Sequence, residues 1–208
     1  MTQNVINQPY QSTKGDIMGG TGTRPAILPV GANGTILTAD STQTTGLKWT
    51  TTPAPGGLVQ QAYNSTNSFV AVATSIPYDD TIPQITEGTQ ILTCSITPTS
   101  ATNLLMIEFS GFIFNQGQLP GCVALFQDAT ANALNAVSVA IQDTGAASEI
   151  WNTTFLRFRK VSGTTSAITF RIRIGVGSLG NQISLNGNSS RKYGGAATAS
   201  LTVWEIAV

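Results

Sequence analysis

The sequence predicts an all-β protein whose C-terminal part is a sandwich or barrel. After residue 57, short apolar segments recur at close spacing, separated by Gly, Asn, Asp, Ser and Pro. In the later segments apolar and polar residues alternate, which is the period of a half-buried strand. β-branched and aromatic residues are abundant in them. Eight or more short strands at regular spacing are typical of a sandwich or barrel.

The clearest alternation lies in AITFRIRI, at the start of segment 167–176. There Ile168 and Ile172 would face one side of a sheet, and Arg171 and Arg173 the other. One segment, 133–141, could form a helix by composition, but its neighbours are typical of strands. The expected strands are 68–76, 90–96, 104–114, 122–128, 133–141, 153–161, 167–176 and 199–207.

The composition divides the chain near residue 57. Residues 1–57, rich in Gly, Pro, Thr and Asn, are predicted to be an N-terminal tail and stem for attachment, and residues 58–208 a head domain. Within the stem, ILTADSTQTTGLKW predicts a short hairpin anchored by Trp49. Such a segment buries too little apolar surface alone, so it must pack on the head, on identical copies of itself, or on another protein.

Charge and residue types exclude several functions. Ten basic residues balance ten acidic ones, so no global field attracts a polyanion, and nucleic acid is not an expected partner. Charged residues are only 10% of the chain, and low net charge favours association. The chain has no histidine, the commonest general base and metal ligand. We therefore expect no enzyme activity, no catalytic residue, no metal and no cofactor.

The two cysteines and the apolar segments also bear on location. Cys94 and Cys122 are too few for a zinc site, and we expect buried reduced thiols, with a disulfide between them as the alternative. No apolar run approaches the roughly 20 residues that a membrane helix needs, and the N-terminus lacks a signal-peptide pattern. The sequence thus predicts synthesis in a cytoplasm and no membrane insertion.

Two stretches resemble a known class of proteins. Residues 14–49, with KGD, GTG, the LPVGANG turn, LTAD and a closing GLKW, resemble a segment that recurs in bacteriophage tail-fibre and related virion proteins. Further on, IPYDDTIPQITEG, ALFQDATANAL and SLTVWEI resemble the compact head at the end of many such proteins. That head is similar to the jelly roll of the C1q and tumour-necrosis-factor superfamily.

This resemblance implies a ten-strand jelly-roll β-sandwich, a homotrimer around a three-fold axis, and a place in a virion made in the host cytoplasm. The N-terminal segment would attach to other virion proteins. The head would then be a fibre or receptor-binding head that contacts the host surface, possessing no enzymatic role. Because the chain is short for a tail fibre, a trimeric capsid decoration protein (a cement or head-fibre protein) is the alternative, and a free sugar-binding module a third hypothesis.

The final strand, ASLTVWEIA, supplies the candidate trimer interface. Leu201 and Val203 would face one side, and Trp204 and Ile206 the other, so the strand is apolar on both sides. One side should meet the core and the other a neighbouring copy.

Polar loops supply the candidate ligand site. The loop SLNGNSSRKYGG (184–195) combines Gly, Asn, Ser, two cations and an aromatic residue, as a sugar-binding loop on a rigid scaffold would. An ordinary long hairpin is the alternative. A second loop, 142–152, is a weaker candidate of the same kind. The candidate residues are Asn186, Asn188, Arg191, Lys192, Tyr193 and Trp151.

Two charged groups have a structural and a functional interpretation. Arg157 and Arg159 lie two apart on one expected strand, and Arg171 and Arg173 lie two apart on another, so the four would crowd if these strands were neighbours. We expect acidic side chains to pair with them. The alternative is that they bind an anionic sugar or a phosphate. Adjacent Asp79 and Asp80 favour an Asx turn over a calcium site, which needs six to eight oxygens.

Overall fold

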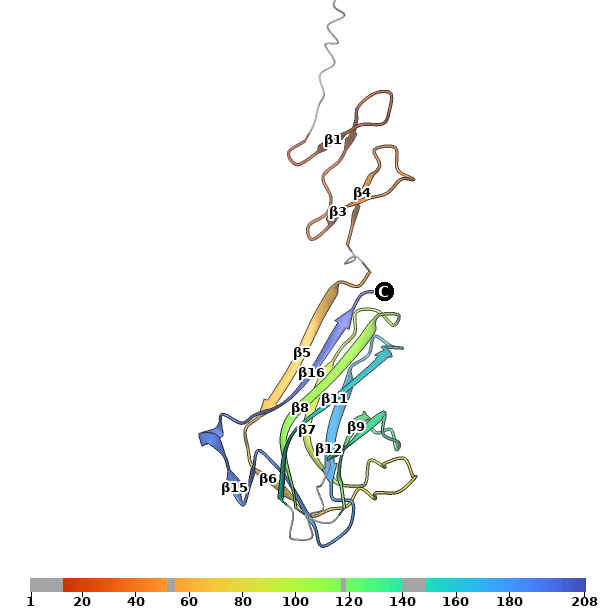
Figure 1. Ribbon diagram of the computed structural model, residues 1–208. Helices are drawn as coiled ribbons and strands as arrows, with labels where there is room; N and C mark the ends of the chain where they lie inside the picture. Colours follow the sequence, from red (N-terminus) through yellow and green to blue (C-terminus); the bar gives the residue numbers. More distant parts are fainter. Residues whose placement is uncertain (1–12, 52–54, 117–118, 140–148) are drawn as a thin grey trace, which may run out of the picture. The chain divides into compact units, whose positions relative to one another are not determined.

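The computed structural model describes residues 13–51, 55–116, 119–139 and 149–208. The chain divides into two compact units, residues 1–54 and residues 55–208 (Figure 1). The division lies three residues before the end of the predicted stem. Each unit is described by itself below.

The N-terminal unit consists of two short hairpins. Strands β1 (Ile17–Gly19) and β2 (Ala26–Leu28) form the first, and β3 (Ile36–Ala39) and β4 (Leu47–Thr50) the second, which confirms the predicted hairpin. Trp49 donates its indole N–H to the carbonyl of Pro29 at 2.7 Å. Its ring lies against Gly31, where a Cβ would come within 2.6 Å of ring carbons. Trp49 therefore anchors the unit, and Gly31 leaves room for its ring.

The described residues of the head form two large antiparallel sheets and a small hairpin of β14 (Gly187–Asn188) and β15 (Ser190–Arg191). The four-stranded sheet has the order β10–β9–β12–β7, and in the six-stranded sheet β5, β16, β8 and β11 lie side by side (Figure 1). Beyond the end of β16, the short strand β13 pairs with the same side of β8, and β6 pairs with β13. The bounds are β5 (Leu58–Thr66), β6 (Val70–Val72), β7 (Thr89–Ile96), β8 (Leu104–Gln116), β9 (Gly121–Gln127), β10 (Asn135–Val139), β11 (Glu149–Val161), β12 (Ile168–Gly175), β13 (Gln182–Leu185) and β16 (Ala199–Ile206).

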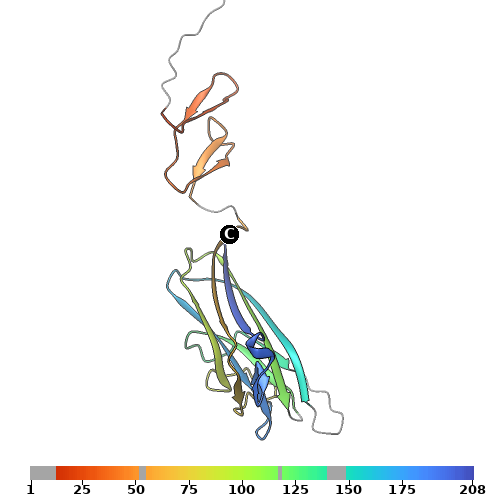
Figure 2. The same ribbon diagram turned by 90° about the vertical axis from the view of Figure 1, so that its left-hand side faces the viewer.

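The strand order is that of a jelly roll. Consecutive long strands alternate between the two sheets, except for the β9–β10 hairpin, and the last strand, β16, returns between β5 and β8. This is the connectivity of two Greek keys in one sandwich. The long strands curve along the head, as Figure 2 shows. The two sheets together hold the ten strands that the resemblance implies, so the jelly-roll prediction is confirmed.

The core lies between the sheets and is filled from both by period-two alternation. On β12, Ile168, Phe170 and Ile172 are buried while Arg171 is not, as predicted. On β8 the buried side chains include Ile107 and Phe109. Burial of this many aliphatic and aromatic side chains, at roughly 1.5–3 kcal/mol each, is the main source of stability.

Side-chain amides close the open edges of the sandwich. Asn64 of β5 donates to the carbonyl of Thr93 on β7 at 2.7 Å, and Gln60 donates to the carbonyl of Thr97 just beyond β7, also at 2.7 Å. On the other side, Asn135 of β10 donates to the carbonyl of Arg157 on β11 at 3.1 Å. Backbone carbonyls that would lack a ladder partner are satisfied in this way.

The observed strands agree with most of the predicted segments. Segment 133–141 contains strand β10, not a helix, while segment 68–76 forms only the three-residue β6. Strand β5 was missed because LVQQAYNST has polar residues on both faces, as an edge strand with one half-buried face can have. No helix among the described residues has the length and apolar content needed to cross a bilayer.

Both cysteines are free, so the reduced-thiol prediction is confirmed. Cys94 is buried on β7, and burial raises its thiol pKa. Burial and the nearby Glu87 carboxylate raise the pKa of Cys122 to about 11. Neither thiol is therefore a ready nucleophile at neutral pH.

Candidate oligomerisation and ligand-binding surfaces

The final strand, β16, has apolar side chains on the outer face of the six-stranded sheet as well as in the core. Leu201 and Val203 of β16 are fully buried in the core, so Trp204 and Ile206 lie on the opposite side, where both are half-buried. Trp204 is opposite Met106 of β8, and Ile206 is opposite Leu104. The strand is therefore apolar on both sides, but only one side meets the core.

Strand β11 adds two apolar side chains to this surface, with Arg157 and Arg159 between them on the same face. Val161 is opposite Leu104, and Phe155 is opposite Ser110, so both side chains share the face of Trp204. Val161 is 54% exposed and Phe155 is 47% exposed. Large apolar side chains in such positions mark interaction sites when they adjoin one another. Below, the name outer face refers to the apolar residues on this side of the sheet, which are Leu104, Met106, Phe155, Val161, Trp204 and Ile206.

An ion pair lies at the middle of the outer face. Arg157 of β11 contacts the Glu108 carboxylate of β8 at 2.8 Å, and its guanidinium lies 5.2 Å from the centre of the Phe155 ring. Both groups reach solvent, with 58% of the Arg157 side chain and 24% of the Glu108 side chain exposed. Burial by a partner would strengthen this pair, because its environment would become less polar.

Four aromatic rings gather at the far end of β8 and β11. Trp151 stacks on Phe112 with ring centres 5.3 Å apart, and tilts against the buried Phe114 at 4.7 Å. Tyr193 contacts Phe112 from the other side at 6.0 Å. Two segments that the sequence analysis singled out separately thus place one aromatic residue each beside Phe112. Trp151 lies on strand β11 and not in a loop, and Tyr193 lies in the loop 184–195. We call Phe112, Trp151 and Tyr193 the aromatic platform.

Trp151 and Tyr193 both reach solvent. Trp151 is 39% exposed and Tyr193 is 74% exposed. Tyr193 also has a left-handed backbone, with φ of 51°, which is uncommon for a non-glycine residue and costs on the order of 1 kcal/mol. Its neighbours Gly194 and Gly195, with φ of 63° and 92°, adopt the same region at no such cost. The loop therefore holds a mostly exposed ring in a strained conformation.

Asn186 supports the loop from beneath rather than facing solvent. It is fully buried, and its amide donates to the carbonyls of Thr66 and Ser68 at 3.0 and 3.1 Å. Its φ of 58° sets the turn out of β13. Among the residues predicted to bind a ligand, Asn186 is therefore the one whose side chain is buried and supports the loop.

The other predicted ligand residues lie on the surface of the loop. Arg191 is exposed, and Lys192 and Asn188 are half-exposed. The side-chain amide oxygen of Asn188 accepts a hydrogen bond from the Ser189 hydroxyl at 3.2 Å. Arg191 lies over Gly195, where a Cβ would come within 2.9 Å of its guanidinium. Among the described residues, neither cation has a carboxylate within ion-pair distance.

The four predicted arginines do not crowd together. Strands β11 and β12 belong to different sheets and are not neighbours, so the condition for crowding is not met. Arg171 donates to the carbonyl of Asp128 and to Gln90, and Arg173 donates to the carbonyls of Glu87 and Gly88. Arg157 has the acid partner that was expected, Glu108. Arg171 and Arg173 instead hold loops in place through these hydrogen bonds.

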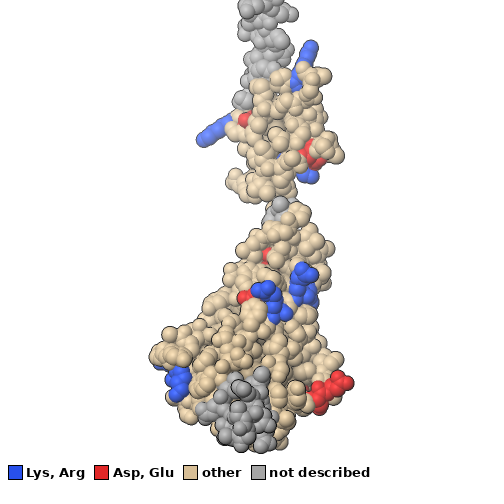
Figure 3. Space-filling model, viewed as in Figure 1, with Lys and Arg blue, Asp and Glu red and all other residues tan. Residues whose placement is uncertain are grey.

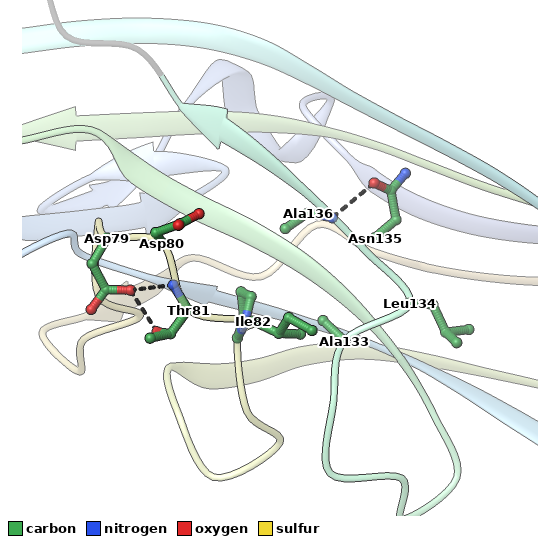
Figure 4. Close-up of a pocket in the computed structure, with 9 residues that line it drawn as sticks. Asp79, Asp80, Thr81, Ile82, Ala133, Leu134, Asn135 and Ala136 are labelled. Carbon is green, nitrogen blue, oxygen red and sulfur yellow. Dashed lines mark hydrogen bonds between the residues drawn. The ribbon is translucent and has the colours of Figure 1, made fainter.

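Asp79 and Asp80 line an open pocket of about 410 Å³ between two loops (Figure 4). Asp79 accepts hydrogen bonds from the backbone N–H and hydroxyl of Thr81, which confirms the Asx turn and lowers the pKa of Asp79. No cluster of three or more His, Cys, Asp or Glu side chains in the described segments could hold a metal ion. The remaining lining residues are Ile82, Pro83 and 133–136.

Charged side chains are sparse on the surface. On the face of the head seen in Figure 3 most of the surface is uncharged. Two basic groups lie close together beside an acidic one in its upper part, and further charged groups lie apart at its lower edges. This matches the low charge content of the sequence.

Comparison with known proteins identifies no family. No protein-family model matches the chain, and no curated protein matches it. Solved structures that are similar include the Eiger TNF of S. frugiperda, with 12% identity and a TM-score of 0.43 over 74% of this chain and 94% of that one.

Two other similar structures are less alike. Dimeric latent PorU of Porphyromonas gingivalis has 8% identity and a TM-score of 0.30 over 91% of this chain and 19% of that one. VP2 of infectious bursal disease virus, in a subviral particle, has 14% identity and a TM-score of 0.29 over 88% of this chain and 47% of that one. All three TM-scores are below 0.5, so the strand order above, and not these similarities, defines the fold.

Proposed function

We propose that the chain is a non-enzymatic structural protein of a bacteriophage virion, a homotrimer whose jelly-roll head contacts the host surface. The observation that carries this proposal is the outer face of the six-stranded sheet. It places Trp204, Ile206 and Val161 on the solvent side of a sheet whose other side already fills the core. A protein surface of this kind is stable and soluble when a partner covers it.

Two further copies of the chain are the partners that fit best. Identical subunits around a rotation axis bury such faces in a closed assembly, which leaves no interface open for further growth. The chain has no net charge to keep copies apart. The resemblance of the head to the C1q and tumour-necrosis-factor jelly roll favours three copies over two.

Residues 1–57 would attach the trimer to other virion proteins. Between residues 13 and 51, Gly19 is the only residue that is buried, so the unit has no core of its own. Its exposed apolar side chains include Met18, Val30 and Ile36 at 54%, 53% and 48%. A unit built in this way needs a partner surface. The resemblance of residues 14–49 to tail-fibre and related virion proteins supports a partner in the virion.

The second candidate is a trimeric capsid decoration protein. The observation that favours it is the form of the described N-terminal residues, two hairpins of three- and four-residue strands with exposed apolar side chains. Such a segment suits attachment along the surface of another protein, here the major capsid protein. In this role the same trimeric head would ornament or clamp the capsid.

Two measurements test the proposal. Light scattering on the purified full-length chain should give three times the 21.7 kDa mass of one chain at micromolar concentration. A well-folded monomer would contradict the trimer. Quantitative mass spectrometry of purified virions should then find a few tens of copies or fewer for a tail fibre and hundreds for a decoration protein; absence from virions would contradict both.

A further inference from the structure

We propose that the aromatic platform and the adjoining loop 186–195 form a binding site for an acidic saccharide, a sugar that carries a carboxylate or a phosphate. This inference deepens the proposed function, because it names what the head would recognise on a host surface. Tyr193 and Trp151 would stack on the sugar ring, and Arg191 and Lys192 would contact its anionic group. The site lies wholly within the head.

The ring geometry suits a sugar. Trp151 and Tyr193 each contact Phe112, with ring centres 5.3 and 6.0 Å from its own, and are 39% and 74% exposed. Two solvent-exposed rings are thus held on one buttressing ring. The negatively polarised face of an aromatic ring attracts the partly positive C–H groups on one face of a pyranose. Tyr and Trp also lose little conformational entropy on binding, since each has two side-chain torsions.

The charges beside the rings favour an anionic sugar over a neutral one. Arg191 and Lys192 immediately precede Tyr193, and no described carboxylate neutralises either one. A guanidinium presents a fork of donors that matches carboxylate and phosphate oxygens. The polar side chains of Asn188, Ser189 and Ser190 are on the same loop and can hydrogen-bond sugar hydroxyls.

The loop is held in shape before any ligand binds. The Lys192 N–H donates to the Asn186 carbonyl at 3.1 Å, and the Asn67 amide donates to the Gly195 carbonyl at 3.4 Å. The buried Ser184 hydroxyl donates to the Gly187 carbonyl at 2.6 Å. A loop fixed by its own hydrogen bonds loses less entropy on binding, which raises affinity. The strained and exposed Tyr193 is then kept in position by the structure around it.

The site is separate from the centre of the proposed trimer contact. Along β8, Phe112 lies eight residues beyond Leu104, which is roughly 26 Å of strand. The polar residues Glu108 and Ser110 lie between them on the same face. A contact centred on Trp204 and Ile206 can therefore leave the aromatic platform open.

Binding of the full-length protein to immobilised polymers tests the inference. The probes are polygalacturonate, which carries carboxylates, poly(glycerol phosphate), which carries phosphates, neutral dextran, and polyglutamate, which carries carboxylates without sugar rings. We expect binding to one or both of the first two and not to dextran or polyglutamate. Which acidic polymer binds tells whether the ligand carries a carboxylate or a phosphate. Added salt should weaken the binding, because the anionic contact is screened.

Matched variants connect binding to the site. Tyr193→Ala and Trp151→Ala should each weaken binding about tenfold, since one stacking contact contributes on the order of 1 kcal/mol. Arg191→Ala should weaken it and reduce its salt dependence. Tyr78→Ala is the control, because Tyr78 is also exposed, at 61%, but lies on another loop; it should bind as the wild type does.

Several results would overturn the inference. These are no binding to either acidic polymer, equal binding to dextran or polyglutamate, or unchanged binding of both platform variants. Loss of the trimer in Tyr193→Ala would also overturn it, because the ring would then belong to the subunit contact. Light scattering on the same samples keeps the two proposals apart: a wild type that binds the acidic polymer as a monomer would contradict the trimer and support the saccharide site.

Discussion

Asn103 donates its side-chain amide to the carboxylate of Glu205 at a distance of 2.6 Å, and Glu205 is fully buried. The same carboxylate accepts hydrogen bonds from Gln60 at 2.6 Å and from the N–H and hydroxyl of Thr99 at 2.8 Å. These partners come from β5 and from the connection between β7 and β8. Glu205, near the end of β16, thus joins three segments at one end of the sandwich.

Replacement of Glu205 should destabilise the head. In Glu205→Gln the new amide cannot accept all of these hydrogen bonds, and buried donors lose their partner, so the free energy of unfolding should fall by about 2–4 kcal/mol. Urea unfolding followed by tryptophan fluorescence measures this. Asp80→Asn, at an exposed carboxylate outside the outer face, is the control and should change it by less than about 1 kcal/mol. Equal effects would mean that the buried network stabilises little.

The stability of the head should also fall in acid because of Glu205. Burial raises the pKa of this carboxyl, but the hydrogen bonds from Gln60, Asn103 and Thr99 outweigh burial and hold the pKa below its ordinary value of 4.5. The unfolded chain therefore takes up a proton first as the pH falls past about 4.5. The stabilisation is complete above that pH and is lost as the pH falls toward the lower pKa of the folded state.

Urea unfolding between about pH 7 and pH 3 checks this dependence. The wild type should lose stability over the acid part of the range, and Glu205→Gln should lose less. Asp79, whose pKa is also lowered, contributes equally in both proteins and so does not disturb the comparison. A Glu205→Gln profile parallel to that of the wild type would contradict the assignment.

Charge on the outer face should prevent trimer formation. Trp204→Asp and Ile206→Asp place a carboxylate where we expect apolar contact, so light scattering at micromolar concentration should find monomers. Circular dichroism should show that the β fold is kept, because both side chains lie outside the core. Asp79→Ala is the control and should remain trimeric. Trimers in both aspartate variants would mean that the subunit contact lies elsewhere.

A small change at Gly31 should loosen the N-terminal unit. In Gly31→Ala the added methyl would meet the Trp49 ring at 2.6 Å, and such overpacking costs about 1–3 kcal/mol. Trypsin should then cut after Lys48 faster than in the wild type. Gly20→Ala is the matched control, since a Cβ there meets nothing within 4 Å. If both variants are cut at the same rate, Trp49 does not anchor the unit.

The sequence predicted the strands whose alternation is visible in the residues themselves. In β12, buried Ile and Phe alternate with Arg, so strand and facing could both be predicted. In β8, LLMIEFSGFIF is apolar at most positions, so the strand was evident but the side that Phe112 faces was not. Strand β5 has polar residues on both faces and gives no apolar period, so it was missed.

The candidate site depends on the pairing register between strands, which cannot be predicted from the residue pattern of any single segment. Trp151 lies beside Phe114 because β11 pairs with β8 in one particular register, and Tyr193 reaches Phe112 through a loop that leaves β13. The sequence could nominate Trp151 and Tyr193 as exposed aromatic residues on polar loops, but not their proximity. It could not foresee that Asn186 faces inward either, because its hydrogen-bond partners lie about 120 residues earlier in the chain.

The side-chain amides at the sandwich edges bear on how copies of this protein behave when crowded. Asn64, Gln60 and Asn135 occupy carbonyls of the strands across from them, so the head offers few free groups to which an unrelated strand could add. Aggregation through these edges is then disfavoured even where copies of the head are crowded. The apolar outer face is the surface that stays exposed.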